Sequence, residues 1–388
     1  MNISELKPVV VALYNAGIAG MIWGQPGIGK SDLFRAVAET CRDQLGLTGP
    51  VLERHEVAAF LMNGGDLRQA FGIFDIRLSQ SDPVDIGGLP REDKSNGSME
   101  RLPPNWFAHN GRTDLPDHGI LLLDELPTAP LSVQTAAYQI VLDKVIDKYK
   151  LKDGWSCFAA GNRLTDGGQY FKMPNALANR FCHLEAESNL DSWVDWAINN
   201  NIDYSLIAFV RFKPELLNTF ADHVENKRKG FSFATERVLE RVNDVLNNNT
   251  QGLTDEVLIA ITGGLAGTGW AAEYMAFRKV WQNMPSIQQI FIDPQTAILP
   301  EDAATQYAVC TALAGAVTYN NAPQAFDYVD RFTQKGRSEM TMLFVKDMQR
   351  RAGVAQKKAQ EAGDTTYMRP ESSPAYTKWA HANKDLFG

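Results

Sequence analysis

One stretch near the start of the chain decides the fold, and it reads Gly24-Gln25-Pro26-Gly27-Ile28-Gly29-Lys30-Ser31. It fits the pattern G-x-x-x-x-G-K-S, in which backbone N–H groups surround a phosphate and the following helix presents its positive N-terminus. Residues 18–23 form a short apolar run that predicts a strand, and residues 33–45 carry apolar side chains at helical spacing. Strand, loop and helix is the context that the pattern requires, so a chance glycine-rich turn is a poor alternative.

Each residue type in this loop has a chemical reason. The glycines let the backbone approach an anion and adopt positive φ angles. Lys30 would bring a positive charge to the β- and γ-phosphates, and the Ser31 hydroxyl would be a ligand of Mg²⁺. The predicted nucleotide-binding residues are therefore Gly24 to Ser31, and the predicted cofactors are ATP and Mg²⁺.

Two acidic residues follow a second apolar run. Residues 119–123 read Gly-Ile-Leu-Leu-Leu, which is typical of a strand buried on both faces of a parallel sheet, and Asp124 and Glu125 come next. Ligands bind at the carboxyl ends of the strands in such sheets. Asp124 is expected to hold Mg²⁺, and Glu125 is expected to polarise the attacking water as a general base. Without the upstream loop, the pair would more often be the entry to a helix, with the aspartate as its cap.

Strands and helices alternate along the first half of the chain. Residues 131–142 predict a helix, residues 155–160 a buried strand, residues 174–180 a short helix and residues 181–185 a strand. This alternation indicates an α/β fold with a doubly wound parallel sheet, and together with the loop at residues 24–31 it predicts a P-loop NTPase. Residues 51–119 fit less well, because glycine and proline interrupt short strands, and we expect loops inserted into the core there.

Helical spacing dominates from residue 189 onward, for example in the apolar stripe of residues 235–246. The chain of 388 residues also exceeds the size of one ordinary core. The sequence therefore predicts an α/β nucleotide-binding core at 1–188, a helical lid at 189–282 and a helical C-terminal region at 283–388.

The composition argues against several classes of protein. A net charge of -8 provides no global field that would attract a phosphate backbone, so nucleic acid is a less favoured partner. No apolar run approaches the roughly 18 to 20 residues that span a bilayer, and the N-terminus lacks the features of a signal peptide. The four cysteines form no C-x-x-C pair and have apolar neighbours, which indicates buried free thiols. The expected location is the cytoplasm, without membrane insertion.

Five segments together resemble the AAA+ ATPases, and within them the MoxR-like and dynein-related branch. The segments occur in the family's order and comprise residues 24–31, 82–90, 120–130, 159–163 and 177–181. The match is close from about residue 17 to residue 250 and looser beyond. The resemblance implies an AAA+ core followed by a helical lid, and an ATP hydrolase whose site is completed by a neighbouring copy.

The resemblance also implies roles for two residues near the end of the core. Asn162 matches the sensor that helps to orient the attacking water, although asparagine is also an ordinary turn residue. Arg180 matches the arginine finger that reaches the γ-phosphate bound by the next subunit. The alternatives are that Arg180 is a cation at a helix C-terminus, or that Arg163 is the finger.

Arg237 matches the second sensor, which closes the helical lid on the nucleotide. Here the chain departs from the family's pattern, because Glu236 stands where a proline is usual. Glu240 lies three residues after Arg237, so a surface salt bridge is the alternative explanation.

The resemblance implies a ring-forming ATPase, expected to be a hexamer, that remodels a separate protein partner. Members of this branch often work with a protein that carries a von Willebrand factor A domain, and this chain has no D-x-S-x-S signature of its own. Two alternatives stay open: a nucleic-acid-directed NTPase motor, and a slow nucleotide-dependent assembly scaffold. The polar segment from Arg91 to Arg101 is a candidate pore or partner-facing loop, or else a plain solvated loop.

Overall fold

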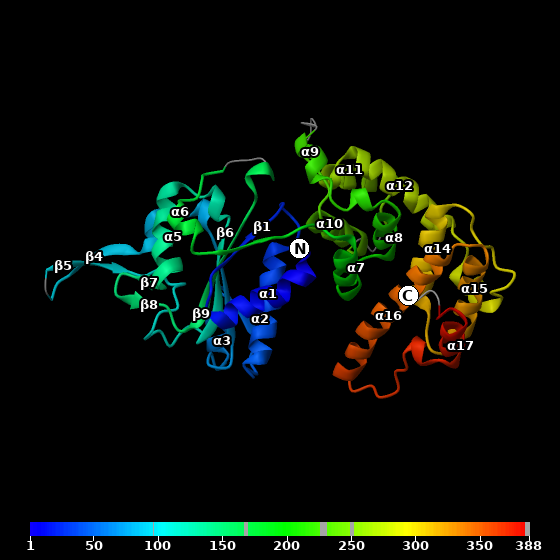
Figure 1. Ribbon diagram of the computed structural model, residues 1–388, viewed down its shortest axis with the longest axis horizontal. Helices are drawn as coiled ribbons and strands as arrows, with labels where there is room; N and C mark the ends of the chain where they lie inside the picture. The colour runs from blue at the N-terminus through cyan, green and yellow to red at the C-terminus, as the bar shows by residue number, and fades with distance from the viewer. Residues whose placement is uncertain (96, 167–169, 226–230, 249–251, 385–388) are drawn as a thin grey trace. The chain divides into compact units, whose positions relative to one another are not determined.

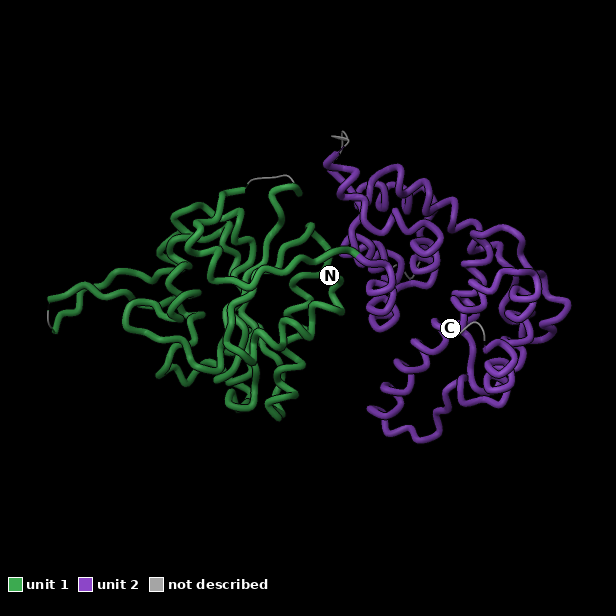
Figure 2. Tube along the Cα trace, in the orientation of Figure 1, with its two compact units in different colours: residues 1–188 green, residues 189–388 purple. Residues whose placement is uncertain are grey.

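The computed structural model describes residues 1–95, 97–166, 170–225, 231–248 and 252–384. The chain forms two compact units, Met1–Ser188 and Asn189–Gly388, which are coloured separately in Figure 2. We describe each unit by itself. The assignment of functional domains at 1–188, 189–282 and 283–388 stays a prediction.

A parallel β-sheet forms the centre of the first unit (Figure 1). Its strand order among the described residues is β10-β1-β9-β6-β3-β2, and every neighbouring pair is parallel. The strands are β1 (Gly20–Trp23), β2 (Val51–Glu53), β3 (Phe71–Arg77), β6 (His118–Asp124), β9 (Gly154–Gly161) and β10 (Cys182–Glu185). The N-terminal strand β1 therefore lies inside the sheet, between β9 and β10.

Helices cover both faces of this sheet. The helices are α1 (Ile3–Ala16), α2 (Lys30–Gln44), α3 (Val57–Met62), α4 (Pro83–Gly87), α5 (Leu131–Asp143) and α6 (Asn175–Ala178). Side chains alternate across β6, so Ile120 and Leu122 join the core under α1 and α2, whereas Leu121 and Leu123 join the core under α5. The predicted fold class, a doubly wound parallel sheet of the P-loop type followed by helices, is confirmed.

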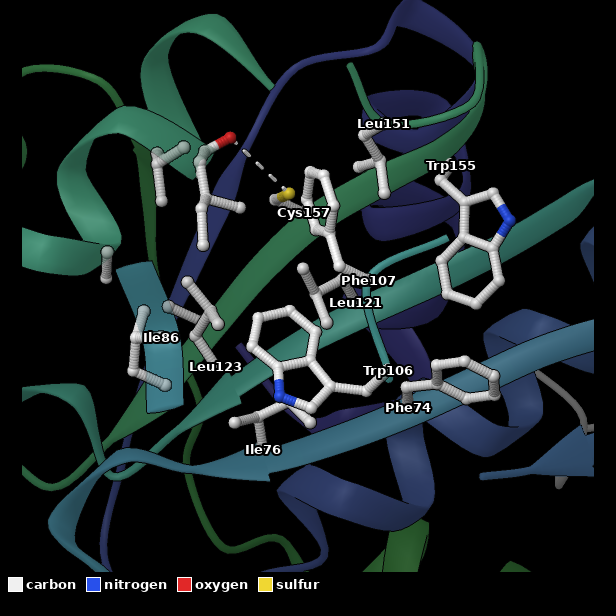
Figure 3. Close-up of a cluster of buried hydrophobic side chains, with 14 of the residues drawn as sticks. Phe74, Ile76, Ile86, Trp106, Phe107, Leu121, Leu123, Leu151, Trp155 and Cys157 are labelled. Atoms are coloured by element: carbon white, nitrogen blue, oxygen red, sulfur yellow. Dashed lines mark hydrogen bonds between the residues drawn. The ribbon is translucent and has the colours of Figure 1, made fainter. Parts of the chain in front are cut away.

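Trp155 anchors the core on the α5 side of the sheet (Figure 3). Its ring is fully buried, lies 4.8 Å from the ring of Phe74, and covers Gly72 and Gly119 on the two neighbouring strands β3 and β6. A β-carbon on either glycine would lie 2.6 Å from the indole. The two glycines therefore leave the space that the Trp155 ring occupies.

The expectation of inserted loops at residues 51–119 was wrong in one respect. This region supplies β2 and β3, and β3 pairs with the full length of β6. The sequence signal was weak because the second half of β3 alternates apolar and charged residues, with Asp75 and Arg77 in exposed positions. Strand β3 is thus buried in its first half and partly exposed in its second half. It therefore lacks the continuous apolar run that marks residues 119–123 as a strand.

The segment from Arg91 to Arg101 belongs to an antiparallel hairpin. Its strands are β4 (Leu89–Asp93) and β5 (Ser98–Leu102), and they extend away from the rest of the first unit (Figure 1). Near its base Glu100 pairs with both Arg91 and Lys148, and Lys148 joins the short strands β7 (Val145–Ile146) and β8 (Tyr149–Lys150). An ordered hairpin therefore replaces the expected loop.

The second unit is helical. Its helices are α7 (Leu190–Asn199), α8 (Tyr204–Phe212), α9 (Phe220–Glu225), α10 (Glu236–Asn247), α11 (Asp255–Ala266), α12 (Thr268–Asn283), α13 (Ile287–Ile292), α14 (Ala303–Ala316), α15 (Ala322–Gln334), α16 (Ser338–Glu361) and α17 (Pro374–Ala382). Helix α14 contributes to two hydrophobic clusters, one built mainly from α7 to α12 and the other from α13 to α17. Of the helices in the described residues, none is long and apolar enough to cross a membrane.

We predict that Gly119→Ala destabilises the first unit. The new methyl group would meet the carbonyl oxygen of Gly72 at 2.7 Å and the Trp155 ring at 2.6 Å, and neither can move without disturbing the sheet. Overpacking of this kind costs about 1 to 3 kcal/mol. Urea unfolding followed by tryptophan fluorescence should show a lower midpoint for the variant.

The matched control is Gly269→Ala in α12, where no atom lies within 4 Å of an added β-carbon. Its midpoint should stay the same or rise slightly, because alanine restricts the unfolded chain. An unchanged midpoint for Gly119→Ala would contradict the packing described for Trp155.

Candidate functional site

The glycine-rich loop joins the end of β1 to the start of α2. Gly27 and Gly29 have φ angles of +79° and +88°, which residues with a side chain rarely adopt. Gly24 has a different constraint, because its N–H donates to the Gly161 carbonyl at 3.1 Å and an added β-carbon would lie 2.8 Å from the Ala186 oxygen. Each glycine of the motif is therefore required by backbone conformation or by close packing.

The Lys30 ammonium group lies over this loop. Its Nζ donates to the carbonyl oxygens of Gly24 and Gln25, at 2.6 and 2.9 Å, and to Oδ1 of Asn162 at 3.1 Å. Asn162 directly follows the last residue of β9, the strand beside β1. The fold thus brings together the predicted phosphate ligand and the predicted sensor, which lie 132 residues apart in sequence.

The acidic pair lies at the carboxyl end of β6. Asp124 is the last residue of the strand, and its Oδ1 accepts the Glu125 N–H at 2.9 Å. Burial raises the pKa of Asp124, while the hydrogen bond from Glu125 and the positive charge of Lys30 act in the opposite direction. Asp124 is therefore a partly desolvated carboxylate in the field of the lysine of the phosphate loop.

Glu125 is held in a left-handed conformation, with a φ angle of +56°. This conformation costs a residue with a side chain of order 1 to 3 kcal/mol, and such strain is concentrated at functional sites. The Ser79 hydroxyl, from the short 3₁₀ helix η1 (Leu78–Gln80), donates to Oε2 of Glu125. The carboxylate of the predicted base therefore has a fixed direction.

Sequence reasoning missed the residues that β3 brings to this site. Arg77 is paired in register with Asp124, Asp75 lies two residues earlier, and Ser79 lies two residues later. The available signal was the apolar run that precedes Asp75, which resembles the start of a core strand. The Asp75 side chain reaches the surface, but its carboxyl group is partly desolvated by its neighbours; this desolvation, followed by the negative charges of Asp124 and Glu125, raises the pKa of Asp75 to about 6.

The two candidate arginine fingers differ in their surroundings. Arg163 is tied to its own unit, because Nη2 donates to the Ala186 carbonyl at 2.9 Å and Nη1 lies 3.8 Å from a Glu185 oxygen. Arg180 is exposed, and its side chain forms no hydrogen bond or ion pair with any described residue. Of the two, Arg180 is the cation that is available to another molecule.

A chain of hydrogen bonds leads from the phosphate loop to the segment that carries Arg180. Trp23, the last residue of β1, donates its indole N–H to Nδ1 of His183 at 2.8 Å, so the imidazole proton lies on Nε2. The His183 Nε2 in turn donates to the Ala178 carbonyl in α6 at 2.8 Å. Arg180 lies two residues after α6, so its position depends on this chain of contacts.

Arg237 lies in the second unit, on the first turn of α10, after Thr235 caps the helix. Its side chain is exposed. Glu236 accepts a hydrogen bond from Asn218 at 2.9 Å. The role of Arg237 as the second sensor therefore stays a prediction.

A buried parallel strand, a G-x-x-x-x-G-K-S loop and a helix define a P-loop fold. The acidic pair at the end of β6 and the helical second unit complete the fold class that the sequence predicts. No protein-family model matches the chain, and no curated protein matches it either.

Solved structures show limited similarity to the chain. A candidate ATPase from Cytophaga hutchinsonii is 12% identical, with a TM-score of 0.32, over 68% of this chain and 80% of that one. NtrX from Brucella abortus is 13% identical, with a TM-score of 0.36, over 89% of this chain and 67% of that one. A structure of NtrX from Brucella abortus in complex with ADP is 13% identical, with a TM-score of 0.35, over 89% of this chain and 68% of that one. Similarity at this level assigns no activity to this chain.

The raised pKa of Asp75 predicts a pH-dependent stability. The ordinary pKa is 3.8, so between about pH 4 and pH 6 the unfolded chain loses this proton while the folded chain retains it. Folding is therefore penalised above pH 6 and not below pH 4. The free energy of unfolding of Asp75→Asn, compared with that of the parent, should rise across this interval in urea titrations.

The control is Asp43→Asn, which removes an exposed carboxylate from α2. The rise for Asp75→Asn should exceed any change for Asp43→Asn, whose carboxylate pairs with Arg42 at the surface. Parallel pH profiles for Asp75→Asn and the parent protein would show that Asp75 ionises normally in the folded chain.

Proposed function

We propose that this protein is a Mg²⁺-dependent ATPase that works as a ring of identical subunits. One observation carries the proposal: the Lys30 ammonium lies between the carbonyls of the phosphate loop and Asn162, beside the acidic pair. The loop, the acidic pair and Asn162 come after three adjacent parallel strands, so their side chains share one edge of the sheet. ATP is the proposed substrate of this edge.

The loop supports nucleotide binding through its charge and its backbone. The N-terminus of α2 and the loop N–H groups would meet the phosphates, and Lys30 would exchange its carbonyl partners for phosphate oxygens. Gly24 to Ser31 are the proposed binding residues. The positive φ angles of Gly27 and Gly29 suit a backbone that curves around an anion.

The donor set fits Mg²⁺, which prefers oxygen ligands and keeps several waters. The Ser31 hydroxyl and the Asp124 carboxylate are the protein ligands that we propose. When bound, the ion would neutralise charge on the phosphate oxygens. Asp124 suits this role because its carboxylate is partly desolvated and would gain from a cation.

Glu125 is the proposed general base. Its strained backbone and the hydrogen bond from Ser79 direct the carboxylate, and Asn162 would help to orient the water. Arg180 is the proposed finger for a neighbouring subunit, because it is exposed and unpaired among the described residues. Arg237 is the proposed second sensor on the helical lid.

The finer parts of the function rest on the sequence resemblance. We propose a hexameric ring of the MoxR-like branch that acts in the cytoplasm on a separate protein, with a von Willebrand factor A domain protein as the first candidate. The net charge of -8 favours a protein partner over nucleic acid. The hairpin of β4 and β5 is the proposed contact with the partner, because it extends from the unit (Figure 1).

Lys30→Ala and Glu125→Gln should separate nucleotide binding from hydrolysis. Without Lys30 the loop has no side-chain cation for the phosphates, so ATP binding should be lost in isothermal titration calorimetry. Glu125→Gln should bind ATP within a few-fold of the parent, while its turnover should fall by about 10² to 10⁴ because the amide is no base.

The matched control is Glu39→Gln, which changes an exposed glutamate on α2. Its binding and turnover should equal those of the parent. Tight ATP binding by Lys30→Ala would overturn the assignment of the phosphate loop, and parent-like turnover by Glu125→Gln would place the base elsewhere.

Arg180→Ala tests whether the site spans two subunits. The variant should bind ATP almost normally but turn over about 10³ to 10⁵ times more slowly, as for arginine fingers supplied in trans. Mixing it with Lys30→Ala should restore part of the activity. Some interfaces then combine the intact loop of one variant with the intact arginine of the other.

Mixing Lys30→Ala with Glu125→Gln is the control, because both residues belong to the loop side of one site and no interface becomes complete. This mixture should stay inactive. If the Arg180→Ala mixture also stays inactive although mixed rings form, Arg180 is not a finger, and Arg163→Ala would be tested in the same way.

A further inference from the structure

A cavity in the second unit contains a cation that has no hydrogen-bond partner among the described residues. The cavity has a volume of about 610 Å³ and lies between the end of α14, the middle of α16 and residues 364–370. The side chains of Arg351 and Lys358 from α16 form part of its wall, together with Tyr204 from α8. None of the residues proposed above for ATP binding or hydrolysis lines it.

The Arg351 guanidinium is stacked against a tyrosine and otherwise unsatisfied. Its Cζ lies 3.6 Å from the centre of the Tyr204 ring. All three nitrogens are buried, and none has an acceptor in hydrogen-bonding geometry within the part of the chain that the structure describes; Tyr204 offers the guanidinium the face of its ring. Burial lowers the pKa of Arg351, and the nearby Tyr204 and Asp347 oppose this shift. A buried guanidinium without hydrogen bonds is costly, so such a group normally has a counter-ion.

The neighbouring carboxylates are already engaged. Asp347 is fully buried, and both of its oxygens accept from Arg211 in a two-pronged pair that joins α8 to α16. Arg350 pairs with Asp195, with 2.6 Å between Nε and Oδ1. Three arginines thus surround one buried aspartate, and the charge of Arg351 is the one that remains without a carboxylate.

The rest of the cavity wall suits an anion. Lys358 lies seven residues after Arg351, which places both cations on one face of α16 about 10 Å apart along the axis. The Lys358 ammonium donates to Oδ1 of Asn201 at 3.2 Å and is otherwise open to solvent. Among the described residues that line the cavity, Asp364 is the one carboxylate, and its Oδ1 accepts both the N–H and the hydroxyl of Thr366 at 2.7 Å.

Gly315 preserves the arrangement around Arg351. A β-carbon at this position in α14 would lie 2.4 Å from the Tyr204 ring and 3.1 Å from Nη1 of Arg351. Tyr204 is 39% exposed and begins α8, so one side of its ring covers the guanidinium while the rest reaches the surface of the cavity wall. Rotation of Tyr204 would uncover the guanidinium toward the cavity.

We propose that this cavity is a binding site for a small anionic ligand. A phosphate or carboxylate group of the ligand pairs with the guanidinium of Arg351 when Tyr204 turns aside, and the far end of the ligand reaches Lys358. The planar guanidinium of arginine can donate two parallel N–H hydrogen bonds to a phosphate or to a carboxylate. The volume is sufficient for a small molecule that carries two anionic groups.

The test uses the full chain with Lys30→Ala, so that phosphate binding by the ATP loop does not contribute. Pyrophosphate and citrate are the two probes, which distinguish a phosphate ligand from a carboxylate ligand, and sodium chloride at equal ionic strength is the reference. At least one probe should raise the melting temperature in a saturable way. Adding Arg351→Met should weaken that binding at least tenfold, and the variant should fold because methionine removes an unpaired buried charge.

Lys358→Met provides a second test at an exposed position, where folding is not at risk, and should weaken binding several-fold. The matched control is Lys357→Met, an exposed neighbour that pairs with Glu361 and does not line the cavity; it should bind like the parent. The proposal is overturned if neither probe stabilises the Lys30→Ala protein beyond sodium chloride. It is also overturned if binding is unchanged by both Arg351→Met and Lys358→Met. Neither outcome bears on ATP binding, which is tested separately by comparing the parent protein with Lys30→Ala.

Discussion

Parallel pairing of β1, β9 and β6 is the interaction on which the rest of the first unit depends. Parallel strands end at the same edge of a sheet, so the residues at the carboxyl ends of neighbouring strands must lie close together. The phosphate loop comes directly after β1, Asn162 comes directly after β9, and the acidic pair ends β6. The hydrogen bond between Lys30 and Asn162 is a direct consequence of this geometry. The core that holds these strands together therefore also sets the distances within the site.

Several features of the site are energetically unfavourable, and the stability of the surrounding core offsets their cost. Glu125 has a backbone conformation that side chains disfavour, Asp124 is a partly desolvated acid, and Asp75 is an acid with a raised pKa beside it. None of these features stabilises the fold. They are explained if the edge of the sheet receives a cation and a nucleotide, because positive charge would relieve the desolvation of the carboxylates. Such a cost is tolerable next to a core that contains Trp155, Phe74 and Phe158 fully buried.

The second unit contains two kinds of buried charge, one that is paired within the fold and one that is not. Arg211 and Asp347 satisfy each other within the interior and join α8 to α16. Arg351, one helical turn after Asp347, is strongly desolvated but has no acceptor among the described residues. A closed pair of this kind is structural, whereas an unpaired cation beside a cavity is a place where a ligand would gain hydrogen bonds. This contrast, and not the cavity by itself, is the reason to assign a ligand to the second unit.

The sequence by itself determined the fold class, the phosphate loop and the acidic pair, because these depend on local patterns: an apolar run, a helical period and glycines at fixed spacing. It did not reveal β3 as a sheet strand, since Asp75 and Arg77 break the apolar pattern. Only the tertiary structure showed that Ser79 orients Glu125, that Arg163 is bound within its own unit while Arg180 is available, and that Arg351 has no acceptor among the described residues. These facts depend on which residues distant in the chain become neighbours, and neighbours are decided by packing of the whole unit, which no local pattern encodes.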